Sequence, residues 1–196
     1  MAEPRERAPS IKGTAFQSAP EDLLRLLASG RISRDELEVR LEAEDLAILE
    51  TKINPSGWYP IASYTRIVEL LAEREAPDDR DGYCAARGVR AAERLAGTGI
   101  YQQLAISAEK LGARVGKFAI TLSQVFYNFG RWSYEVGNGR DAFTVEVREA
   151  SAFPEVSRFA TQGFIEWAAT RMAGRPMRVV SERPRPDLVI FRGRRG

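Results

Sequence analysis

The sequence predicts an α+β fold, with a helix-rich N-terminal half and an antiparallel sheet of about four strands in the C-terminal third that has helices packed on one side. Residues 132–136 and 143–147 alternate apolar with polar side chains, as strands with one buried face do, and a dense Gly/Asn turn signal separates them. A helical pattern over 154–173 precedes two more apolar segments, 177–180 and 188–191. This order favours an antiparallel sheet with helices segregated to one side.

The first part of the chain is predicted to be helical after a polar start. Residues 1–19 mix charges without a sustained period, and we expect a flexible arm there. A helix is predicted to begin near Pro20 and to stop at Gly30. Ser33 followed by Glu36 predicts a capping box for the next helix.

The middle of the chain contains an aromatic segment and a helix of small residues. After an expected extended piece at 48–53, Trp58 and Tyr59 lead into a helix that carries Tyr64. These aromatics are candidates for lining a ligand pocket, and the alternative is that they close the core. Cys84 lies near the start of a helix rich in Gly and Ala. It is an activated or acylated thiol if the helix N-terminus lowers its pKa, and otherwise a buried, inert cysteine.

Apolar residues over 104–129 recur at steps of three and four, which predicts one long helix or two in sequence. Phe126 and Tyr127 broaden this apolar stripe, so we expect the helix to contact two partners, one of which is a candidate second subunit.

Composition points to one domain and removes several classes of site. We expect the 196 residues to form one α+β domain over 20–192, followed by a basic tail at 193–196. Lys and Arg total 29 against 27 Asp and Glu, so charge alone does not predict nucleic-acid binding. The chain has no histidine, which excludes Ser-His-Asp triads, histidine-ligated haem and ordinary zinc sites. We predict no catalytic residue, no metal and no cofactor.

A single cysteine rules out internal disulfides and fits a reducing compartment. No apolar segment approaches the length of a membrane span, and the N-terminus lacks the apolar stretch of a signal peptide. These observations predict a cytoplasmic protein.

The pattern over residues 54–192 resembles a known superfamily. The local matches are Trp58-Tyr59-Pro60, Gly137-Asn138 between two strands, and Phe153-Pro154-Glu155 at a helix start. The superfamily joins haem nitric-oxide-binding domains, four-vinyl-reductase-like domains and the small subunits of the Golgi tethering complex TRAPP. The most similar set is one of myxobacterial paralogues of similar length and unknown function.

The resemblance implies a domain that binds a small ligand or a partner protein between helices and sheet and that dimerises through helices. The chain departs from the haem branch because it has no proximal histidine, and from the four-vinyl-reductase branch because it has no metal-binding cysteines near its end. Tethering subunits can carry an acylated cysteine near a helix start, where this chain has Cys84.

Our leading hypothesis is therefore a non-catalytic cytoplasmic regulatory or scaffold module, dimeric, that binds a protein partner or an apolar small molecule. The residues predicted to line its pocket are Trp58, Tyr59, Tyr64, Cys84, Phe118, Phe126, Trp132, Phe164 and Trp167.

Two alternatives stay open. One is an enzyme that uses carboxylates near the sheet, with surface charge as the competing explanation. Its candidates are Glu135, Asp141, Glu146 and Glu166. The other is a nucleic-acid binder that stacks bases on Trp132 or Tyr134 beside basic residues. Those basic residues are Arg175, Arg178, Arg183, Arg185, Arg192, Arg194 and Arg195.

Overall fold

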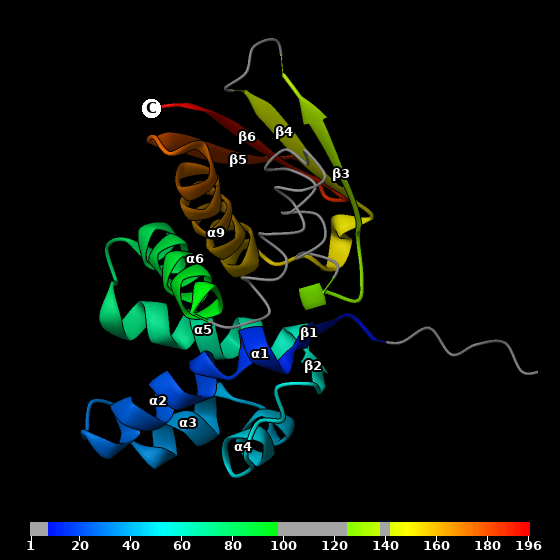
Figure 1. Ribbon diagram of the computed structural model, residues 1–196. Coiled ribbons are helices and arrows are strands. Elements are labelled where there is room, and N and C mark those ends of the chain that lie inside the picture. Colours follow the sequence, from blue (N-terminus) through cyan, green and yellow to red (C-terminus); the bar gives the residue numbers. More distant parts are fainter. Residues whose placement is uncertain (1–7, 98–124, 138–141) are drawn as a thin grey trace, which may run out of the picture.

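A four-stranded antiparallel sheet forms the C-terminal part of the protein, as the alternating sequence pattern predicts (Figure 1). The computed structural model describes residues 8–97, 125–137 and 142–196. The sheet order is β3-β4-β6-β5, so each of the two hairpins places its later strand in the centre of the sheet. The strands are β3 (Arg131–Val136), β4 (Phe143–Arg148), β5 (Met177–Arg185) and β6 (Leu188–Arg195).

Helices cover one face of this sheet in two layers. Helix α9 (Glu155–Ala173) lies directly against the sheet, and α6 (Arg80–Ala96) packs on α9 (Figure 1). Gly174 ends α9 with a φ of 65°, a left-handed conformation that glycine adopts without strain. Alternate residues of the strands, such as Val145, Val147 and Phe191, are fully buried in one cluster with Ile165 and Ala169 of α9.

The N-terminal half contains a second, helical core. Helix α5 (Ile61–Glu75) buries Ile67, Val68 and Leu71 against the shorter helices. Those shorter helices are α1 (Gly13–Phe16), α2 (Ser18–Ala28), α3 (Arg34–Arg40) and α4 (Ala43–Leu49). Ser33 caps α3, because its side chain accepts a hydrogen bond from the Glu36 backbone N–H at 3.1 Å. The predicted capping box is only half formed, since the Glu36 carboxylate pairs with Arg74.

The predicted flexible arm over residues 1–19 is wrong for its second half. Strand β1 (Ser10–Lys12) pairs antiparallel with β2 (Trp58–Pro60), and α1 follows it directly. Ile11 and Phe16 are buried in the helical core, where Phe16 stacks on Tyr59 at 4.7 Å between ring centroids. Two isolated apolar residues in a polar segment show no period, although tertiary contacts bury both of them.

Three other segments also differ from, or lie beyond, the sequence-based expectations. Residues 48–53 are not simply extended, because α4 continues to Leu49. Residues 193–195 of the predicted tail are part of β6, in which Gly193 pairs with both Phe143 and Val179. Most of the helical pattern over 104–129 lies outside the described residues.

In the described parts of the chain, no helix combines the length and apolar character that a membrane span requires.

Candidate functional site

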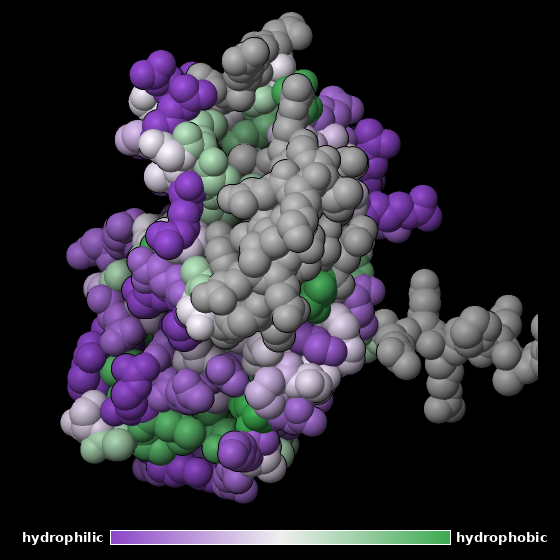
Figure 2. Space-filling view, in the orientation of Figure 1, coloured by the Kyte–Doolittle hydropathy of each residue, from purple (hydrophilic) through white to green (hydrophobic). Residues whose placement is uncertain are grey.

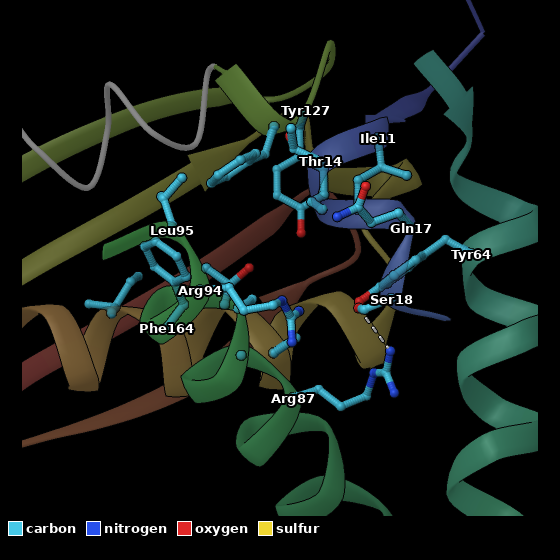
Figure 3. A pocket seen from close by; sticks show the side chains of 17 residues that line it. Ile11, Thr14, Gln17, Ser18, Tyr64, Arg87, Arg94, Leu95, Tyr127 and Phe164 are labelled. Carbon is cyan, nitrogen blue, oxygen red and sulfur yellow. Dashed lines mark hydrogen bonds between the residues drawn. The ribbon is translucent and has the colours of Figure 1, made fainter. Parts of the chain in front are cut away.

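A cavity of about 180 Å³ lies where the N-terminal segment, the helical half and α9 meet (Figure 3). The residues around it come from β1 and α1, the start of α2, helices α5, α6 and α9, and the segment just before β3. They are Ile11, Thr14, Ala15, Gln17, Ser18, Tyr64, Arg87, Gly88, Ala91, Arg94, Leu95, Phe126, Tyr127, Ala160, Thr161, Phe164 and Ile165.

One wall is fixed by the close crossing of α6 and α9. A Cβ atom at Gly88 would lie 2.6 Å from the carbonyl carbon of Ala160, and one at Gly163 would lie 2.7 Å from that of Ala85. Real Cβ contacts are not this short, so the two backbones touch only because both positions are glycine. The side chains beyond this contact diverge around the cavity.

A second wall is the N-terminal segment, which is joined to the chain before β3. Ile11 forms an isolated β-bridge with Tyr127. The Asn128 side chain accepts a hydrogen bond from the Ser10 backbone N–H at 2.6 Å and donates one to the Ala8 carbonyl at 3.1 Å. Residues that are more than a hundred positions apart thus close the cavity together.

The cavity has an apolar part and a polar part. Phe126 and Phe164 meet edge to face at 6.1 Å between ring centroids, beside Leu95 and Ile165. Figure 3 shows Arg87, Ser18 and Tyr64 together on the opposite side from Phe164 and Leu95. An amphipathic molecule would match this division of the lining.

Arg87 supplies a buried positive charge, with only 5% of its surface exposed. Its Nη1 donates to the Asp22 carboxylate and, at 3.2 Å, to the Tyr83 hydroxyl, while Nη2 donates to Ser18 Oγ at 3.2 Å. Burial opposes the charge, but Tyr64, Tyr83 and Asp22 outweigh burial and raise the pKa of Arg87. Its Nε is buried and has no hydrogen-bond acceptor among the described residues. An orphaned guanidinium N–H beside a cavity is unusual, because buried donors are normally paired.

Arg94 is a second cation in the lining, two turns further along α6. Figure 3 shows its side chain extending toward the cavity. Among the described residues, none forms a hydrogen bond or an ion pair with its guanidinium. Partial desolvation and the repulsion from Arg87 lower the pKa of Arg94. It nevertheless stays charged at neutral pH, because an arginine begins so far above that range.

Tyr64 and Tyr127 present buried phenols to the cavity. Burial raises the pKa of both phenols, and the Thr161 hydroxyl only partly offsets this effect at Tyr127. Both phenols are therefore neutral near pH 7 and act as hydrogen-bond donors or acceptors rather than as anions.

The structure places three of the predicted pocket residues around this cavity: Tyr64, Phe126 and Phe164. Tyr59 packs on Phe16, and Trp58 is partly exposed beneath the Lys12 ammonium. The other predicted pocket residues divide between two clusters and the undescribed part of the chain. Trp132 is buried in the sheet core, Trp167 lies in a small cluster with Leu95 and Phe164, and Phe118 is outside the described residues.

Cys84 is also away from the cavity lining. It is fully buried in the helical core, and burial raises the pKa of its thiol to about 11. The thiol is therefore protonated at neutral pH, which disfavours reactions that need a thiolate.

Sequence reasoning missed the polar part of the site, above all Arg87, Arg94 and Ser18. The one local signal is the spacing of the two arginines. They lie seven residues apart on the same helix, on the side that also carries Ala91. The two arginine charges therefore lie on the same face of α6 as its small residues, and not on the opposite face.

The carboxylates proposed for catalysis do not meet in a pocket. Glu166 accepts a hydrogen bond from the Val179 backbone N–H at 2.8 Å and so joins α9 to β5. Glu146 pairs with Arg148, and Asp141 lies outside the described residues. Within the described ranges, no cluster of His, Cys, Asp or Glu could hold a metal ion.

The arginines proposed for nucleic-acid binding are largely engaged within the protein. Arg183 bonds to Glu155 and to the carbonyl oxygens of Ala150 and Phe153, and Arg192 pairs with Glu182. Trp132 is unsuitable as a stacking surface because it is buried between Tyr127, Phe153 and Phe191.

Comparison with known proteins identifies the fold. No family model and no curated protein matches the sequence. Three similar solved structures are the Fe(II) unliganded H-NOX protein from K. algicida, an H-NOX protein from S. oneidensis in the Fe(II)NO ligation state, and a mutant of T. tengcongensis H-NOX. The first has a TM-score of 0.66 at 11% identity and covers 95% of this chain and 97% of its own. The second has a TM-score of 0.61 at 10% identity and covers 95% of this chain and 100% of its own. The third has a TM-score of 0.59 at 13% identity and covers 94% of this chain and 97% of its own. The chain thus shares the fold of the H-NOX domains, the haem-NO-binding part of the predicted resemblance.

Proposed function

We propose that this protein is a non-catalytic, ligand-binding regulatory module whose ligand occupies the cavity between α6, α9 and the N-terminal segment. The observation that carries the proposal is the cavity itself, a largely apolar space with an incompletely satisfied buried arginine at its polar side. Ligand sites of proteins combine apolar walls with a few polar groups that fix orientation. The likeness to H-NOX domains supports a sensor role because one of those structures, the H-NOX protein from S. oneidensis, is described in the Fe(II)NO ligation state.

Haem does not fit the cavity lining. Protein ligands to haem iron are His, Cys thiolate, Met or Tyr. The chain has no histidine, and Cys84 is buried in the helical core and does not line the cavity. Of the described residues around the cavity, only Tyr64 and Tyr127 belong to these types. Burial keeps both phenols protonated, which opposes ligation as phenolate. The described lining therefore favours an organic ligand other than haem.

The lining also supports binding rather than catalysis. Among the described residues around the cavity there is no carboxylate, cysteine or histidine to act as nucleophile or general base. Ser18 Oγ accepts a hydrogen bond from Arg87, which cannot remove a proton from it. The polar groups present can hold and orient a ligand.

A cavity-filling substitution tests this proposal. Ala91→Leu adds three carbons to the α6 side of the cavity, and Ala62→Leu adds the same atoms at an exposed position of α5. We expect toluene, a neutral apolar probe, to raise the melting temperature of the native protein and of Ala62→Leu but not of Ala91→Leu. An equal response of all three proteins, or none in the native protein, would contradict the proposal.

Dimerisation is part of the same proposal. Figure 2 shows hydrophobic side chains gathered over the region of α2 and α3, where Leu24 is exposed and Val39 has 82% of its surface exposed. Such an apolar surface is suited to a second copy of the chain. Sedimentation equilibrium of the native protein and of Val39→Glu tests it: a dimer that Val39→Glu weakens supports the prediction, and a monomer at all concentrations refutes it.

A cytoplasmic location and kinship with the four-vinyl-reductase-like, TRAPP-subunit and myxobacterial proteins stay predictions.

A further inference from the structure

The charges around the cavity restrict the chemistry of its ligand beyond the proposed function, on which this inference rests. The described lining contains two cations, Arg87 and Arg94, and no anion. Asp22 lies just outside the lining and neutralises part of this charge through Arg87, although it also pairs with Arg25. Counted over the described residues, the polar side of the cavity therefore carries an excess of about one positive charge.

Arg87 and Arg94 both line the cavity from α6. Their Cα atoms are separated by seven residues, or about 10 Å along the helix axis. Helical side chains lean toward the N-terminus, so Arg94 leans back toward Arg87. Figure 3 shows the Arg94 head between its own backbone and the Arg87 side of the cavity. The repulsion from Arg87 that lowers the pKa of Arg94 agrees with this arrangement.

The available donors suit a planar anion. On Arg87, Nη1 and Nη2 are engaged by Asp22, Tyr83 and Ser18, and Nε is buried without an acceptor in the described ranges. On Arg94, no donor has an acceptor among the described residues. A carboxylate has two oxygens and could accept from both guanidinium groups, and charge-assisted hydrogen bonds of this kind are stronger than neutral ones.

The size of the cavity limits the rest of the ligand. A cavity of about 150 Å³ holds benzene, so the 180 Å³ observed here has room for a body of similar size next to the polar end. Phe126, Phe164 and Leu95 surround that body with apolar atoms. We propose that the cavity selects a small monocarboxylate of roughly ten non-hydrogen atoms, with its carboxylate held between Arg87 and Arg94 and its apolar body against Phe126 and Phe164.

Matched pairs of probes test the charge directly. Octanoate and octanamide have the same number of non-hydrogen atoms and differ in charge, as do phenylacetate and phenylacetamide. We expect calorimetric titration of the native protein to give each carboxylate a dissociation constant at least about tenfold lower than that of its amide, as charge-assisted hydrogen bonds predict. Equal affinity of acid and amide would overturn the inference.

Two arginine variants on the same helix identify the residue responsible. Both arginines are exposed, but only Arg94 belongs to the cavity lining. Arg94→Met removes a cation from that lining, and Arg90→Met removes one that lies over Tyr83, outside the lining. Arg87 is less suitable for substitution because its loss would leave the Asp22 carboxylate without its buried hydrogen-bond donor. We expect Arg94→Met to abolish the preference for carboxylate while leaving amide affinity unchanged, and Arg90→Met to keep the preference. A preference that survives in Arg94→Met refutes the assignment.

The outcomes separate this inference from the proposed function. If octanoate and phenylacetate fail to bind while toluene binds, the carboxylate inference is wrong and the cavity remains a ligand site. If toluene also fails, both proposals are wrong.

Discussion

The contact between α6 and α9 should depend on the absence of a side chain at Gly88. Alanine at this position would bring its Cβ to 2.6 Å from the carbonyl carbon of Ala160. Carbon atoms pack at about 3.5–4.0 Å, so the helices would have to separate by roughly 1 Å. The obstacle is backbone inside a helix, which cannot turn aside as a flexible side chain could.

The expected loss of stability follows from two opposing effects. Overpacking costs about 1–3 kcal/mol, and the rigid neighbour places Gly88→Ala toward the upper end. Alanine in a helix interior recovers about 1 kcal/mol relative to glycine. The net destabilisation is therefore about 2 kcal/mol, or roughly 4–8 °C in melting temperature for a chain of this length.

Urea unfolding of the native protein, Gly88→Ala and Gly97→Ala provides the measurement. Gly97 lies at the C-terminal end of the same helix, and a Cβ there would make ordinary contact at 3.4 Å. We expect Gly97→Ala to unfold within about 0.5 kcal/mol of the native protein. If Gly88→Ala is as stable as this control, the close backbone contact is not a constraint and the cavity wall is not fixed as described.

Three further perturbations have defined outcomes. Asp45→Asn should lower stability at pH 7 by about 3 kcal/mol. Burial alone would raise the pKa of Asp45, but Arg66, at 2.5 and 2.9 Å, and the Glu42 N–H outweigh it and lower that pKa. The stabilisation is therefore present above the ordinary carboxyl pKa and lost as pH falls through the folded-state value. The gap in stability between the two proteins should begin to shrink as pH falls below about 4 and close below the lowered folded-state pKa, and a constant gap would refute this account. Cys84, with its pKa raised to about 11, should react with a disulfide reagent at pH 8 some two hundred times more slowly than in unfolded protein; equal rates would refute its burial. Ser33→Ala should cost about 1 kcal/mol in thermal unfolding, and no loss would show that the cap of α3 is dispensable.

The sheet could be predicted because its signal is local. Val145 and Val147 alternate with polar residues within one strand, and the same holds for Trp132 and Tyr134. The pairing of β4 with β6, which joins the two hairpins, leaves no such signal because it depends on residues more than forty positions apart. Strand β1 could not be predicted because its three residues are too few to show a periodic pattern.

The candidate site was only partly predictable because the protein has two cores. Periodicity indicates that an aromatic residue faces inward but not toward which neighbours. The pattern therefore groups Trp132 with Tyr64, although one lies in the sheet core and the other beside the cavity. Arg87 escapes prediction because arginine is normally exposed, and the residue that makes its burial tolerable, Asp22, lies sixty-five positions earlier.

Packing stability alone does not explain an arginine at this cavity. Apolar replacements of buried ion pairs are often neutral or stabilising, so retaining Arg87 gives the fold no clear advantage. Its partners Asp22, Ser18 and Tyr83 satisfy the outer nitrogens and hold the guanidinium still, yet the described residues offer Nε no acceptor. A structural arginine would be most stable with every donor paired. A cation that is held rigid at the edge of an apolar space, with the Arg94 cation in the same lining, is the arrangement that a binding site for an anionic group requires.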